Sequence, residues 1–216
     1  DDLGLDADMA LEVSAKEIDG QEFQEINLPG AELDGAEGQP ALPLITRLVA
    51  VPDGKTLQVA DLATRDTKVD GDFRPWPAQG LKSVADKSIS LDSRFYLGGN
   101  KASASQPLVA VGEPSLLRGI RVVPVYFRPV SWAPGSDGLN VAAEIDATFD
   151  LVDASDGNNS SGSARKIPQS FVTILEKQVI GFDKRAANVM EGPGTYLIIH
   201  PNNATVLSKL QPLISW

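Results

Sequence analysis

The sequence predicts a mainly β protein: an antiparallel β-sandwich or jelly roll, followed by a short helix and the first strand and helix of an α/β domain. Three observations support this class. Residues 9–152 form short alternating apolar and polar stretches, separated by turn residues from a pool of 19 glycines and 15 prolines. Helical spacing of apolar residues begins only after residue 167. Residues 192–216 combine an apolar run with an amphipathic helix pattern.

The strands of the β region follow one another at short intervals. Leu11, Val13 and Ala15 alternate with polar neighbours, as a strand with one buried face requires. Short strands at this spacing are typical of antiparallel sandwiches and jelly rolls. Further strand candidates occupy residues 23–28, 41–52, 57–62, 88–97 and 107–111.

The longest β stretch covers residues 116–132 and contains Pro124 and Pro129. Because proline cannot donate to a strand ladder, we expect this stretch to kink or to change sheets. The most regular alternation follows at residues 139–152, which predicts a half-buried strand. Its apolar face is expected to carry Val141, Ala143, Ile145, Ala147 and Phe149.

The composition changes at residues 155–166, where Asp, Gly, Asn and Ser crowd together without a hydrophobic period. This pattern predicts a flexible linker after a β domain of residues 1–154. Beyond it, Phe171, Leu175 and Val179 recur near one helical face, and Pro168 suits a first turn. We therefore assign residues 167–191 to a connecting helix and its flanking sequence.

Residues 192–216 predict the beginning of an α/β domain. The apolar run 196–200 suits a buried strand, and the following leucines recur at helical spacing, with Asn203 or Thr205 placed to cap the first turn. A strand that feeds an amphipathic helix is half of a βαβ unit, which needs a second parallel strand. We therefore expect residues 192–216 to be an incomplete domain.

Composition excludes several functions. The chain has 216 residues and a formal net charge of −10, so we expect neither a nucleic-acid partner nor a membrane partner. The absence of cysteine and the single histidine, His200, exclude a cysteine nucleophile and a histidine metal cluster within these residues. The acidic pairs in "DDLGLDAD" lack the spacing of a calcium loop, so calcium is conceivable without a motif and no cofactor is expected.

Three stretches resemble a known family. "GQPALPLITRLVAVPDG", "EPSLLRGIRVVPVYFRPVSW" with its trailing "LNVAAEIDATFDL", and "TYLIIHPNNATVLSKLQPLISW" are similar to the N-terminal region of gingipain-like cysteine peptidase precursors, the C25 family. The first two resemble the propeptide, and the third resembles the first strand and helix of its caspase-like α/β catalytic domain. Because the catalytic Cys of that family is absent here, the resemblance implies a fragment without catalytic residues of its own.

The resemblance also implies a role. The β region would keep a secreted or cell-surface bacterial endopeptidase latent, cover its active site and assist its folding, with the catalytic domain of the same precursor as partner. The signal peptide would already have been removed. In Arg- and Lys-cleaving members a basic side chain on a propeptide loop can occupy the specificity pocket, and Lys101 on a Gly-flanked loop is the first candidate, with Arg94 second. Candidate maturation sites are the basic pairs Arg165, Lys166 and Lys184, Arg185.

Two rival functions follow from other residues. A β-sandwich could serve as a carbohydrate-binding or adhesion module, with Trp76 and Trp132 as a sugar-stacking platform, although both tryptophans lie beside prolines in expected turns. An acid pair such as Glu144 and Asp146 could form a glycosidase dyad, but both residues belong to the polar face of one strand. A carbohydrate module is the stronger of these two alternatives.

Overall fold

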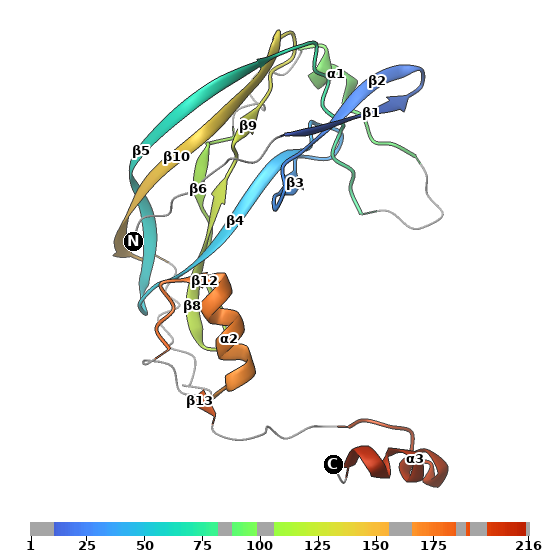
Figure 1. Cartoon of the computed structure of the whole chain (residues 1–216), viewed down its shortest axis with the longest axis vertical. Coiled ribbons are helices and arrows are strands. Elements are labelled where there is room, and N and C mark those ends of the chain that lie inside the picture. Colours follow the sequence, from blue (N-terminus) through green and yellow to red (C-terminus); the bar gives the residue numbers. More distant parts are fainter. Residues whose placement is uncertain are drawn as a thin grey trace.

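The computed structural model describes residues 11–81, 88–98, 106–155, 166–184, 189–190 and 198–214. Antiparallel strands dominate it, which confirms the mainly β class (Figure 1). The sandwich or jelly-roll topology stays a prediction. In chain order the elements are β1 Glu12–Ile18, β2 Gln21–Asn27, β3 Glu32–Asp34, β4 Leu42–Ala50, β5 Lys55–Asp70, α1 Ser93–Tyr96, β6 Val109–Val111, β7 Ser115–Leu117, β8 Ile120–Phe127, β9 Val130–Ser131, β10 Gly138–Asp153, β11 Ile167–Pro168, α2 Gln169–Gln178, β12 Val179–Ile180, β13 Val189–Met190 and α3 Ala204–Ile214.

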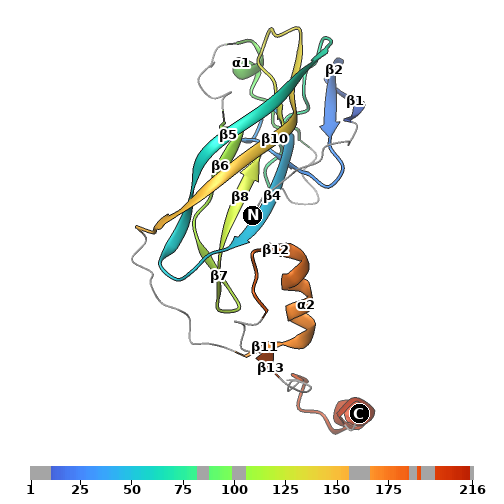
Figure 2. The ribbon, with the colours of Figure 1, turned by 60° about the vertical axis from the view of Figure 1, so that its left-hand side comes forward.

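The strands of the described residues form four sheets. The largest has the order β12-β4-β8-β6, with β3 also paired to β4 and β7 to β8, and a second has the order β5-β10-β9. β1 and β2 form a separate antiparallel hairpin, whereas β11 and β13 pair in parallel, as do β12 and β4. The long strands β5 and β10 run side by side, α1 lies at the top of the view, and α2 lies below the large sheet, between it and α3 (Figure 2).

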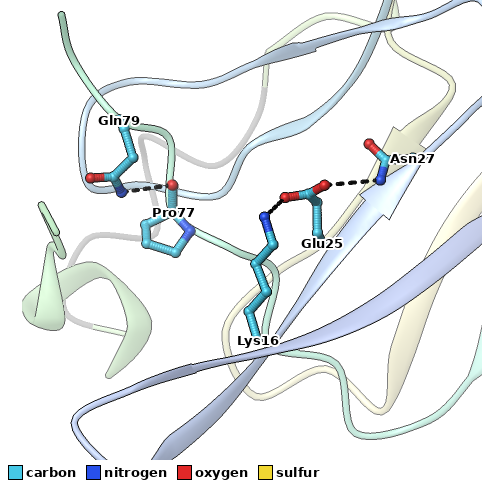
Figure 3. Close-up of polar contacts among 5 residues, drawn as sticks. All are labelled: Lys16, Glu25, Asn27, Pro77 and Gln79. Atoms are coloured by element: carbon cyan, nitrogen blue, oxygen red, sulfur yellow. Dashed lines mark hydrogen bonds and ion pairs between the residues drawn. The ribbon is translucent and has the colours of Figure 1, made fainter. Parts of the chain in front are cut away.

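Two hairpins depend on turn residues with positive φ. Asp19 and Gly20 join β1 to β2 with φ values of 50° and 77°, and Arg118 and Gly119 join β7 to β8 with 54° and 86°. Two successive residues with positive φ match the right-handed twist of the flanking strands, which is why a short residue such as Asp followed by Gly suits this loop. The polar contacts of the first hairpin include an ion pair between Lys16 and Glu25 (Figure 3).

The stretch 116–132 changes sheets, as its prolines predict. β8 lies in the large sheet between β4 and its partners β6 and β7, whereas β9 pairs with β10. Pro124 lies where the partner of β8 passes from β7 to β6, and its carbonyl accepts from the Gly112 N–H at 2.8 Å. Proline has no N–H to donate, and here this gap lies where β8 changes from pairing with β7 to pairing with β6. No hydrogen bond within either ladder is therefore lost.

The main core lies between the two large sheets. Alternate residues of β8, namely Val123, Val125 and Phe127, are fully buried against Ile145 and Ala147 of β10. Val122 points to the opposite face and packs against α2. Because β8 is covered on both faces, its sequence is nearly continuously apolar rather than alternating.

The prediction for β10 holds over half of the strand. Ile145, Ala147 and Phe149 belong to the main core, but Ala142 takes the place assigned to Ala143. A register shift between Ala142 and Glu144 explains the difference, because an extra residue in one strand reverses the faces on either side of it.

The strand predicted over residues 88–97 was wrong, because Ser93–Tyr96 form the helix α1. Asp92 caps this helix, since its Oδ1 accepts the Phe95 N–H at 3.0 Å. The apolar pair Phe95 and Tyr96 is compatible with either structure, and the cap decides in favour of the helix.

The C-terminal region confirms one element of the predicted pair. α3 lies apart from the sheets and has no buried residue (Figure 1). For the strand expected at residues 196–200, positions 196 and 197 lie outside the described residues, and 198–200 belong to no strand. Within the described parts of the chain no neighbouring strand offers these residues a ladder. No helix within those parts has the length and apolarity needed to cross a membrane.

Candidate functional site

The segment that carries Lys101 begins and ends on fixed structure. Residues 99–105, with Lys101, lie outside the described residues, but the residues before and after them are described. On the N-terminal side stands α1, whose Phe95 and Tyr96 are buried. Arg94 lies on the exposed side of the same helix. The second candidate for a blocking cation is therefore held on a capped helix and points away from the core.

Tyr96 fixes the N-terminal side. Its O–H donates to the Pro75 carbonyl at 2.6 Å, and its ring meets those of Phe23 and Trp132 at centroid distances of 5.6 Å each. Burial raises the pKa of the Tyr96 hydroxyl well above its ordinary value, so the group remains a donor throughout the physiological range. A satisfied donor among packed rings makes α1 a rigid support.

The C-terminal side is fixed by β6. The Leu108 carbonyl accepts the Arg128 N–H at 2.8 Å, and Val109 pairs with Phe127 in the large sheet. The described residues that follow the segment therefore lead directly into a strand of the large sheet.

A cavity of about 530 Å³ is lined in part by Phe95 of α1 and by Gln106 and Leu108, which precede β6. We call it the anchor cavity. Phe95 and Trp132 form part of its apolar wall, and Asp34, Asp66 and Arg128 are its charged residues. The full lining is Asp34, Gly35, Ala36, Gln39, Pro40, Leu42, Pro43, Asp66, Phe95, Gln106, Leu108, Arg128, Pro129, Val130, Ser131, Trp132, Ala133, Asn140 and Ala142.

Two residues that line the anchor cavity carry three buried donors with no acceptor among the residues that the structure describes. Arg128 Nη2 donates to Asp34 Oδ2 at 3.2 Å, whereas the Arg128 Nε and Nη1 have no hydrogen-bond partner in the described parts of the chain. The indole Nε1 of Trp132, a residue that is 7% exposed, is also without one. A buried donor without an acceptor costs about 1–3 kcal/mol. Sequence analysis missed this cavity, because its lining residues come from separate segments between Asp34 and Ala142.

The candidate cleavage residues flank α2. Arg165 and Arg185 lie outside the described residues, whereas Lys166 and Lys184 are exposed. Lys184 Nζ lies 3.5 Å from Glu176 Oε1 of α2. The basic pairs thus stand immediately before β11 and shortly after β12.

α2 is packed on the outer face of the large sheet. Val172 and Leu175 are 0% and 1% exposed, in one cluster with Val122 of β8. The Arg118 guanidinium lies 5.1 Å from the centre of the Phe171 ring, and β12 continues from the helix into a parallel pairing with β4. The connecting helix is therefore part of the same folded body as the large sheet.

The sugar-binding platform and the glycosidase dyad both lack the geometry that their functions require. Trp132 is buried, and the Trp76 ring stands edge-on to Phe23 at 6.2 Å, so the two indoles form no exposed platform. Glu144 pairs with Arg65 at 2.9 Å, on the same strand as Asp146 rather than across a cleft from it. Among the residues that the structure describes, no three His, Asp or Glu side chains gather into a metal site.

Comparison with known proteins gives the class of the chain. The family model Propeptide_C25 matches residues 8–189. This chain belongs to the C25 propeptide family.

Individual relatives are gingipains. Lys-gingipain HG66 and Lys-gingipain W83 of Porphyromonas gingivalis are each 25% identical over 219 residues, which cover 95% of this chain. The chain spans only 12% of the length of these curated relatives.

Two solved structures share the fold. One concerns the zymogenic latency of gingipain K from P. gingivalis; it is 24% identical with a TM-score of 0.52 and covers 65% of this chain and 81% of its own. The other is a complex of the pro- and mature domains of RgpB from the same species; it is 18% identical with a TM-score of 0.59 and covers 79% of this chain and 87% of its own.

Proposed function

We propose that this chain is the part of a secreted or cell-surface bacterial cysteine peptidase precursor that keeps the enzyme latent. The family match over residues 8–189 carries the proposal. The partner is the catalytic domain of the same precursor, and the chain contributes inhibition and assisted folding rather than turnover. The absence of any cysteine supports this division of labour, since the nucleophile must come from elsewhere in the precursor.

Lys101 acts as the blocking residue, with Arg94 as the alternative. This assignment is supported by the described residues on either side of Lys101 in the chain, which belong to the capped helix α1 and lead into the strand β6. Arg94 has the exposure that such a role requires. Its position on a helix gives it less reach than a residue in the middle of a loop.

Because the inhibitory segment and the catalytic domain belong to one chain, a modest affinity between them is sufficient for inhibition. At an effective concentration of about 1 mM within one chain, an inhibitory segment with a Kd of about 1 μM occupies its site about 99.9% of the time. Cleavage at Arg165, Lys166, Lys184 or Arg185 removes this advantage. A cut at the earlier pair would leave α2 bound to the sheet through Val172 and Leu175, so the later pair is the better candidate for release.

Inhibition in trans tests the proposal. The chain is added to the separately produced catalytic domain of its precursor, and cleavage of Arg- and Lys-containing peptides is measured with wild type, Lys101→Ala and Arg94→Ala. Lys101→Ala should raise the inhibition constant by about 30-fold or more, as expected for a central anchor residue. Lys177→Ala, at an exposed position of α2, is the matched control.

The inhibition assay distinguishes the latency function from the assignment of the blocking residue. Absence of inhibition by the wild-type chain would refute the latency function. Full potency of both Lys101→Ala and Arg94→Ala would refute the blocking residues alone.

A further inference from the structure

The chain is held to one folded body on both sides of the later cleavage pair. Before that pair, β12 is paired with β4, and Lys184 Nζ lies 3.5 Å from Glu176 Oε1 of α2. After it, Val189 and Met190 form β13, which pairs in parallel with β11 next to the start of α2 (Figure 2). A cut between β12 and β13 therefore creates two chain ends that both lie on the same body.

Val189 contributes side-chain packing as well as backbone pairing. Its side chain is partly buried and packs against the cluster that contains Ile167, Val172 and Leu175. Ile167, which is 3% exposed, is also the pairing partner of Val189 in β11. Removal of β13 would return part of this apolar surface to water, which costs free energy in proportion to the area exposed.

A cut between β12 and β13 would place the two sides of this contact in different chains. β11 and α2 precede the cut and stay with the inhibitory part, whereas β13 follows it and enters the N-terminal segment of the catalytic chain. Strand pairing and apolar packing act between chains as they do within one chain. The inference that follows rests on the proposed latency function and on its later cleavage pair.

The contact between β11 and β13 is too small to hold two chains together by itself, since it comprises two residue pairs and one partly buried valine. It acts together with the contact that blocks the active site. Within an assembled complex a second contact forms at high effective concentration, so it adds to the affinity of the first. Differences in affinity between variants of one interface appear mainly in the rate of dissociation.

We propose that the surface formed by β11 and α2 is a binding site for the N-terminal segment of the cut catalytic chain, with Val189 as its apolar contact. Activation then has two steps. Hydrolysis breaks the C–N bond of the cleavage site, and the water molecule is divided between the new carboxylate and the new amine. Departure of β13 from β11 is part of the second step, in which the inhibitory part dissociates and the enzyme becomes active.

The experiment uses the complete precursor after its maturation cut, with the new N-terminus of the catalytic chain determined by sequencing. The cut complex is diluted, and the recovery of peptidase activity gives the dissociation rate. Val189→Ser should dissociate about fivefold faster than wild type, because a partly buried apolar side chain is lost. Val189→Ile keeps the apolar contact and should stay within about twofold of wild type.

Two controls separate this contact from general effects of substitution. Val13→Ser changes a valine of β1 that is 48% exposed, and its dissociation rate should stay within about twofold of wild type. After complete release, the Val189→Ser enzyme should have the kcat/KM of wild type. This result would place the effect in the contact with β11 rather than in the catalytic domain.

Hydrogen exchange of the wild-type complex needs no variant. The amides of Ile167 and Gln169 should exchange at the same rate before and after the cut, because β13 stays in place. Exchange that is about tenfold faster in the cut complex would overturn the inference. This measurement decides the question if the Val189→Ser precursor does not fold.

Other results overturn the inference and leave the latency function intact. One is an equal dissociation rate for wild type and Val189→Ser. Another is a new N-terminus before Ile167 or after Met190, because β11 and β13 would then remain in one chain. Full activity of the wild-type precursor before any cut would instead remove the latency function, and this inference with it.

Discussion

Leu175→Ala should detach α2 from the large sheet without unfolding the sheet. Leu175 is 1% exposed and lies in the cluster of Ile167, Val172 and Val122. Truncation of a buried leucine costs about 2–5 kcal/mol, and about 3 kcal/mol is expected here because the cluster is small and can partly collapse. Ile174, the adjacent residue, is 52% exposed, so Ile174→Ala should cost less than about 0.5 kcal/mol.

Hydrogen exchange shows which part of the molecule loses stability in Leu175→Ala. A cost of about 3 kcal/mol raises the opening equilibrium of α2 by a factor of about 150, so its amides should exchange correspondingly faster. The amides of β8 that pair with β6 should keep their protection, since Val123 and Val125 face the other core. Equal effects of Leu175→Ala and Ile174→Ala would refute the packing of α2, and equal acceleration in β8 would refute its separate opening.

Three further predictions concern the supports and the hairpin. Asp92→Ala removes the cap of α1 and should destabilise the chain by about 1 kcal/mol, measured by denaturant unfolding; no change would show that the cap contributes nothing. Gly112→Ala places a Cβ 2.7 Å from Pro124 Cγ and should cost about 1–3 kcal/mol in the same assay, while an unchanged midpoint would contradict the close approach. The hydrogen bond from Lys16, and then that from Asn27, hold the pKa of Glu25 below its ordinary value, so the stabilisation is present at neutral pH and lost as pH falls through the lowered pKa. The difference in Tm between wild type and Glu25→Gln should therefore vanish in acid, and a difference independent of pH would count against the pairing.

The sequence predicted elements where one local rule was sufficient. The alternation at Ile145, Ala147 and Phe149 and the sheet change marked by Pro124 and Pro129 both appear in the structure. The bulge at Ala142 was not predictable, because it depends on the register of a partner strand 70 or more residues away in the chain. Residues 88–97 were misassigned since an apolar pair fits either structure and only the Asp92 contact distinguishes them.

The candidate site was only partly predictable, for a related reason. Loop composition singled out Lys101, which lies outside the described residues, and the second candidate, Arg94, is exposed. The buried donors of Arg128 and Trp132 that have no partner among the described residues depend on tertiary packing, since the cavity that both residues line is built from residues between Asp34 and Ala142. An arginine followed by proline and a buried tryptophan carries no sequence signal of this kind.

The parallel pairing of β12 with β4 affects the order in which the molecule can be made. β12 contributes Val179 and Ile180, and it covers an edge formed by Leu48 and Val49. During synthesis that edge stays without its partner until about 130 more residues have left the ribosome, an interval of about 6–26 s at typical elongation rates. An unpaired strand edge can pair with a strand of another chain. Nascent chains on the same messenger RNA would therefore be most prone to intermolecular strand pairing during this interval.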